Sequence, residues 1–62
     1  MKKYRIYKAK AFNEEMRIVP VKELEWEPTE DVYNGYNEAY VKKCDLLINS
    51  EFFYYSVKEE LI

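Results

Sequence analysis

The stretch that decides the fold is residues 29–57, TEDVYNGYNEAYVKKCDLLINSEFFYYSV, because it fits both a helix and a pair of strands. In the helical interpretation Thr29 caps the N-terminus, acidic residues occupy the positively polarised first turn, and apolar side chains recur at three- and four-residue steps. These apolar residues are Val32, Tyr36, Tyr40, Cys44 and Leu47. Gly35, within the turn-prone pair Asn34-Gly35, counts against a helix.

After Val41 the local sequence favours strands. On a strand Tyr40, Cys44, Leu46 and Ile48 would lie on one face, Asn49-Ser50 is a turn signal, and residues 52–57 are rich in aromatic and β-branched side chains. Combining the two interpretations, we expect a short helix or loop at about residues 28–39, followed by a second hairpin.

The N-terminal half predicts a first hairpin. Residues 2–12, KKYRIYKAKAF, are strand-like, residues 13–15 are a polar break, and residues 16–21 are short and β-branched. Pro20 lacks a backbone N–H, so it places this second strand at an edge or ends its pairing.

These elements predict a mainly β fold, a small antiparallel sheet of four or five strands, which could close as an SH3-like barrel, with a short terminal turn at residues 58–62. The alternative is an α+β fold, ββαβ, with one helix on a three-stranded sheet. In either case residues 1–62 form a single small domain.

A chain of 62 residues has a marginal core. Cys44 alone makes no internal disulfide, and a chain without histidine has no nitrogen/sulfur zinc site, so we expect no metal and no cofactor. Aromatic residues make up 18% of the chain, and Tyr and Trp are favoured at interfaces. We therefore expect a homodimer or a complex with a protein partner.

The sequence contains no apolar run long enough for a membrane span, and its N-terminus lacks the pattern of a signal peptide. We expect a cytoplasmic protein with no membrane association.

Charge is distributed unevenly along the chain. Residues 1–12 carry five basic residues and no acid, whereas residues 13–31 carry seven acidic residues against Arg17 and Lys22. The simplest interpretation is that opposite charges face each other across paired strands. A functional alternative is a single-stranded nucleic-acid-binding surface on the basic strand, with rings stacking on bases. Its residues would be Lys3, Arg5, Tyr7, Lys8 and Lys10.

The acidic segment suggests a different function. On an extended strand Glu23, Glu25 and Glu27 would project from one face about 6.6 Å apart, resembling successive phosphates of a nucleic acid. Such a row could occupy the basic groove of a protein that handles DNA or RNA. The alternative is a solvated edge strand whose charges prevent aggregation.

The aromatic residues favour a protein interface. Residues 52–55 are four consecutive aromatics. On a strand their side chains point alternately to the two faces, so both faces must be covered, one by the core and the other by a partner. We expect Trp26, Tyr54 and Tyr55 to anchor a partner, and Glu23, Glu25 and Glu27 to steer it.

The sequence offers little for catalysis. There is no histidine base and no glycine-rich phosphate loop, and Ser50 and Ser56 have no activating neighbour. A minimal nuclease in which carboxylates hold Mg²⁺ is the enzymatic alternative. We therefore predict a non-enzymatic protein-binding module. Its size and acidity suggest a phage- or mobile-element-type inhibitor of a host nucleic-acid-handling or defence protein.

Overall fold

The structure, a computed structural model, describes residues 2–61. Over these residues, three strands and one helix follow in the order β1 (Lys2–Lys10), β2 (Glu27–Tyr33), α1 (Tyr36–Asn49) and β3 (Phe53–Leu61), with a 3-10 turn, η1 (Val21–Glu23), before β2. The sheet order is β2-β1-β3, and β1 pairs antiparallel with both neighbours. The ββαβ alternative is confirmed, and the mainly β description is roughly compatible with it. Within the described residues the sheet is open, with two edges, and does not close as a barrel.

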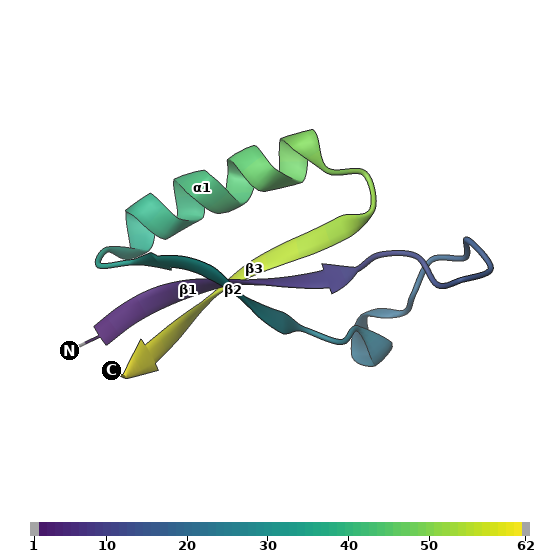
Figure 1. The fold of residues 1–62 in the computed structure, drawn as a ribbon, viewed down its shortest axis with the longest axis horizontal. Helices are drawn as coiled ribbons and strands as arrows, with labels where there is room; N and C mark the ends of the chain where they lie inside the picture. The colour runs from purple at the N-terminus through teal and green to yellow at the C-terminus, as the bar shows by residue number, and fades with distance from the viewer. Residues whose placement is uncertain (1, 62) are drawn as a thin grey trace.

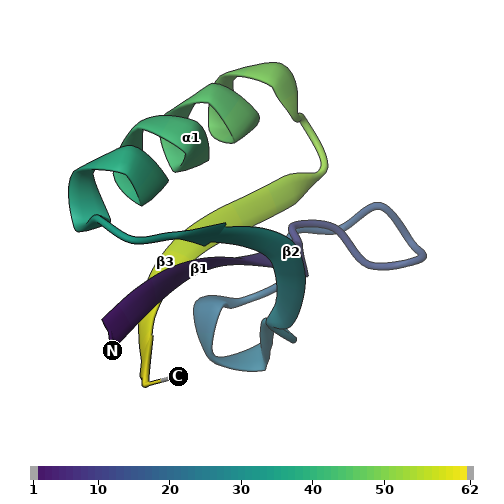
Figure 2. The same ribbon diagram turned by 60° about the vertical axis from the view of Figure 1, so that its left-hand side comes forward.

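Helix α1 exists because of this topology. Since β2 and β3 both run antiparallel to β1, they run parallel to each other, and the chain must return along the sheet between them. A helix of 14 residues spans about 21 Å, close to the length of a seven-residue strand. Figures 1 and 2 show α1 lying across one face of the sheet, with η1 on the other side.

The second predicted hairpin is therefore wrong for residues 40–48, which are helical. Thr29 is also not the helix N-cap: the cap is Gly35, and Thr29 lies within β2. At the other end the Asn49 side-chain amide donates to the Asp45 carbonyl oxygen, one turn earlier in the helix, at 2.8 Å.

Residues 28–33 were expected to be loop or short helix and instead form most of β2. Pro28, Glu30 and Asp31 are poor strand formers, so local propensity alone did not identify this strand. Tertiary contacts hold it: the Thr29 hydroxyl donates to the Ile6 carbonyl oxygen at 2.7 Å.

The predicted first hairpin is reduced to a single bridge between Phe12 and Ile18. Both sides of β1 are occupied by β2 and β3, so residues 16–21 can meet the chain only beyond the end of β1. The intervening turn contains Met16 in the left-handed region, with φ of 62°. It projects beyond the sheet and contributes to a long axis of 41 Å (Figure 1).

The predicted C-terminal strand is present and longer than expected. β3 continues to Leu61, in place of a turn at residues 58–62, because it pairs with β1 without interruption from Phe53 opposite Lys10 to Leu61 opposite Lys2.

The core is small and built around β1. Ile6 is the only large side chain that is fully buried among the described residues, and the other buried residues, Ala9, Ala11 and Ala39, are alanines. Ala39 lies in α1 with no exposed surface, which lets the helix approach the sheet closely. Tyr4 contacts Tyr36 edge-to-face at 5.7 Å between ring centroids, so the even-numbered residues of β1 face α1.

Candidate functional site

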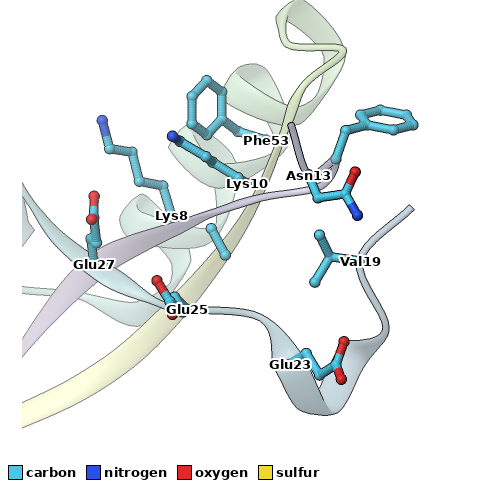
Figure 3. Close-up of a pocket in the computed structure, with 10 residues that line it drawn as sticks. Lys8, Lys10, Asn13, Val19, Glu23, Glu25, Glu27 and Phe53 are labelled. Carbon is cyan, nitrogen blue, oxygen red and sulfur yellow. The ribbon is translucent and has the colours of Figure 1, made fainter. Parts of the chain in front are cut away.

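A pocket of about 290 Å³ lies between the C-terminal half of β1 and the segment that leads into β2. Its charged walls are formed by Lys8 and Lys10 on one side and by three glutamates on the other. Figure 3 shows Lys8, Lys10 and Phe53 projecting from the strands, with Glu23 and Glu25 along the incoming chain. The glutamates are Glu23, Glu25 and Glu27, and with Lys8 and Lys10 they are called here the charged pocket.

Strand register and the long connection position these side chains. Lys8 lies directly opposite Glu27 in the pairing of β1 with β2, so both emerge on the same face. The Lys8 Nζ atom lies 5.5 Å from the centroid of the Phe53 ring. Asn13, at the rim, holds its turn in place because its side-chain oxygen accepts the backbone N–H groups of Glu15 and Arg17 at 2.9 and 3.0 Å.

The charged pocket contains both signs of charge without close pairing. Within residues 2–61, none of its five charged groups has an opposite charge within 4.0 Å. Two ammonium groups and three carboxylates give it a net charge of −1. Phe12, Val19 and Phe53 supply apolar surface beside these charges. The pocket can therefore contact a ligand that carries a cationic group, hydrogen-bond acceptors and an apolar portion.

The residues expected to bind a protein are distributed over three places. Glu23 ends η1, Glu25 lies in the connection and Glu27 begins β2, so only the step from Glu25 to Glu27 approaches the even spacing of a strand. The exposed glutamates alternate with half-buried Leu24 and Trp26.

The two tyrosines expected to anchor a partner point to opposite faces of β3. Tyr54, which is 40% exposed, lies opposite Ala9 on the face away from α1. Tyr55 is half-buried and lies opposite Lys8 on the face that carries the helix. Neither lines the charged pocket, where Phe53 is the contribution of β3.

The residues expected to bind nucleic acid are divided between the two faces of β1. Lys8 and Lys10 project on the α1 side and line the charged pocket, whereas Lys3, Arg5 and Tyr7 project on the opposite face. Lys3 donates a hydrogen bond to the Asn34 side-chain oxygen.

Arg5 and Tyr7 are bound to one carboxylate, Glu60 of β3. The Arg5 Nε atom lies 3.0 Å from Glu60 Oε2, and the Tyr7 hydroxyl donates to Glu60 Oε1 at 2.5 Å. Arg5 also donates to the Thr29 carbonyl oxygen at 2.6 Å. These hydrogen bonds from Tyr7 and Arg5 lower the pKa of Glu60 below its ordinary value, and the same bond to Glu60 raises the pKa of Tyr7. This network ties β3 and β2 to the central strand and leaves Arg5 and Tyr7 less free to bind a ligand.

Several site residues were missed by sequence reasoning. Phe12, Asn13, Val19 and Phe53 line the pocket, and Glu60 joins the Arg5–Tyr7 network. Glu60 is more than 50 residues from its partners in sequence, so no local spacing could have identified it.

No protein-family model matches this chain, and neither a curated protein nor a solved structure is significantly similar to it. Within residues 2–61, no helix is both long and apolar enough to cross a membrane. Over the same residues, no three acidic or cysteine side chains converge as a metal site.

Proposed function

We propose that this protein is a non-enzymatic protein-binding module whose charged pocket receives a basic segment of a partner protein. The observation that supports the proposal is that Glu23, Glu25 and Glu27 line one pocket and that, among the described residues, no cation lies within 4.0 Å of any of them. A guanidinium or ammonium group from a partner would supply the missing counter-charge.

The exposure of the three glutamates determines what they contribute. Exposed carboxylates act mainly on the rate of encounter and on specificity, and their effect weakens with salt. Lys8 and Lys10 on the opposite wall would interact with carbonyl or carboxylate groups of the same segment and fix its direction. Phe12 and Phe53 provide the apolar contact that long-range charge alone does not supply.

The kind of partner follows from the chemistry of the pocket. A protein surface that binds nucleic-acid phosphates is rich in Arg and Lys, and a carboxylate-lined pocket is complementary to such a surface. We therefore propose, as the finer form, an inhibitor of a host nucleic-acid-handling or defence protein, of the kind used by phages and mobile elements. Its support is the small size, the net charge of −2 and the grouping of the three glutamates.

The experiment is a fluorescence titration that follows Trp26, which lies between Glu25 and Glu27 in sequence. The probes are an arginine-containing hexapeptide, a peptide of the same length with glutamate in place of arginine, and single-stranded DNA and RNA, each at low and physiological salt. We expect saturable, salt-sensitive binding of the arginine peptide alone, and its loss in the variant with Glu23, Glu25 and Glu27 all changed to Gln.

The matched control changes Glu14, Glu15 and Glu51 to Gln. These three exposed carboxylates lie outside the pocket, so the control removes the same net charge without altering the site. Equal loss of binding in the control variant would reduce the effect to net charge and contradict the proposal. Saturable binding of DNA or RNA without binding of the arginine peptide would replace it with the nucleic-acid function.

A further inference from the structure

The outer side of β3 is one of the two edges of the sheet. β3 is nine residues long, contains no proline and keeps an unbroken register with β1, whereas its outer side has no neighbouring strand among the described residues. Such an edge presents a row of backbone N–H and C=O groups to any complementary strand.

The charged side chains of β3 contact the neighbouring strand β1. Natural edge strands often carry charged side chains that discourage pairing. On β3 the Glu59 carboxylate lies 3.3 Å from Lys2, Glu60 binds Arg5 and Tyr7, and the Lys58 Nζ atom lies 4.9 Å from the centroid of the Tyr7 ring. All three charges are thus engaged with the neighbouring strand β1, and none of these contacts reaches across the open edge.

We propose that the β3 edge binds the β3 edge of a second copy of this chain, antiparallel and with Val57 on the two-fold axis. The two sheets would then form one continuous six-stranded sheet, with roughly one backbone hydrogen bond per paired residue. This inference rests on the backbone edge of β3 and shares only Phe53 with the lining of the charged pocket, so either proposal can fail without the other.

Self-complementarity selects this register. With Val57 on the axis, Phe53 lies opposite Leu61 and Ser56 lies opposite Lys58, and no like charges face each other. Leu61 is 82% exposed in the single chain, and the ring of Phe53 from the second copy would cover it. A shift of the axis to Lys58 sets two lysines against each other. A shift to Ser56 leaves Leu61 beyond the paired strands.

The test uses the sign of one added charge. Ser56 lies on the face away from α1, opposite Tyr7. In the proposed dimer Ser56 of each copy faces Lys58 of the other copy, so this pair occurs twice. Ser56→Lys therefore places like charges together and should raise the dimer dissociation constant about tenfold, whereas Ser56→Glu places opposite charges together and should lower it. The measurement is sedimentation velocity over a range of protein concentrations, with circular dichroism to establish folding.

The controls are Asn37→Lys and Asn37→Glu, which add the same charges at an exposed position of α1. They should leave the dissociation constant unchanged. A wild-type chain that remains monomeric up to about 1 mM overturns the proposal. So does a dimer that neither Ser56 variant changes, or one that both variants weaken. Tighter association of Ser56→Glu cannot arise from poor folding, so the test stands even if the lysine variant unfolds.

Discussion

The two edges of the sheet differ in how well they are protected from further pairing. At β2, two residue steps along β1, from Arg5 to Tyr7, correspond to four steps of the partner, from Val32 to Pro28, so the pairing is interrupted by a shift of register. At β3 the register with β1 is unbroken over all nine residues. Proline and an irregular register are both features that blunt an edge, and β3 has neither.

The two edges are also held to β1 by different chemistry. β2 depends on hydrogen bonds that involve its backbone: the Arg5 guanidinium reaches the Thr29 carbonyl oxygen, and the Thr29 hydroxyl reaches the Ile6 carbonyl oxygen. β3 adds ion pairs to a complete ladder. An irregular edge therefore needs specific side chains, whereas a regular edge is held mainly by its backbone.

The largest effect should come from the side chain that supports both edges. Ile6→Ala removes the one large, fully buried side chain of the described core, and should lower the free energy of unfolding by about 2–4 kcal/mol. For so small a domain this is a large part of the total stability. Urea unfolding followed by circular dichroism measures it. Ile18→Ala, at a position that is 68% exposed, is the control and should change the free energy by less than about 0.5 kcal/mol.

The attachment of β3 should depend on pH through Glu60. Because its pKa is lowered in the folded chain, ionised Glu60 contributes stability above its ordinary pKa of 4.5, and this contribution is lost as the pH falls from there through the folded value. Tyr7, whose pKa is raised, contributes below its ordinary value of 10.0, and this is lost as the pH rises through its folded value. The network is therefore intact between these two limits.

Glu60→Gln should make the melting temperature fall less steeply than in the wild type as the pH is lowered from 5. Glu14→Gln, in the exposed turn after β1, should leave that slope as it is in the wild type. Identical acid profiles for wild type and Glu60→Gln would show that the network does not hold β3 in place.

The attachment of β2 should depend on one hydroxyl. Thr29→Val keeps the β-branched shape but removes the donor to Ile6 and the acceptor for the Asp31 N–H at 3.2 Å, and should cost about 1 kcal/mol in unfolding free energy. Hydrogen exchange of the β2 amides measures the local effect. Thr29→Ser, which keeps the hydroxyl, should retain most of the protection. Equal loss in both variants would attribute the effect to side-chain shape.

The smallest effect should be at the junction of β2 with α1. Gly35 is the helix N-cap, with no side-chain hydrogen bond and with φ of −116°, which any residue can adopt. A Cβ atom there would meet only Glu38 Oε1 at 3.6 Å and Glu38 Cδ at 4.0 Å. Gly35→Ser should therefore raise the unfolding free energy by about 0.5 kcal/mol, measured by urea unfolding. Gly35→Ala adds the Cβ without a capping oxygen and should gain less. A loss of stability in both would mean that the junction needs glycine.

The strands with regular patterns were the predictable part of the fold. Residues 2–12 intersperse apolar and charged side chains in short alternating runs, and residues 52–57 are dense in aromatics, so β1 and the start of β3 were identified from local preference. β2 was missed because its residues have low strand propensity, and its strand conformation depends on pairing with β1.

The candidate site was predictable only in part. The spacing of Glu23, Glu25 and Glu27 at every second residue singled out these three glutamates, and they do line one pocket. Their opposite wall was assigned to a different function, because Lys8 and Lys10 were grouped in sequence with Arg5 and Tyr7. The pleat of β1 places these two pairs on opposite faces, as the period-two alternation of any strand requires, and the structure adds that Lys8 and Lys10 are on the face that carries α1.

The sequence by itself determined the composition of the chain, its uneven charge and the strands whose side-chain pattern is local. Only the tertiary structure decided that residues 36–49 are a helix, that residues 27–33 are a strand, and which charges face one another. The physical reason is the range of the interactions. Alternation and propensity act between neighbours, whereas the return crossover from β2 to β3 and the contact of Glu60 with Arg5 and Tyr7 join parts of the chain that are distant in sequence.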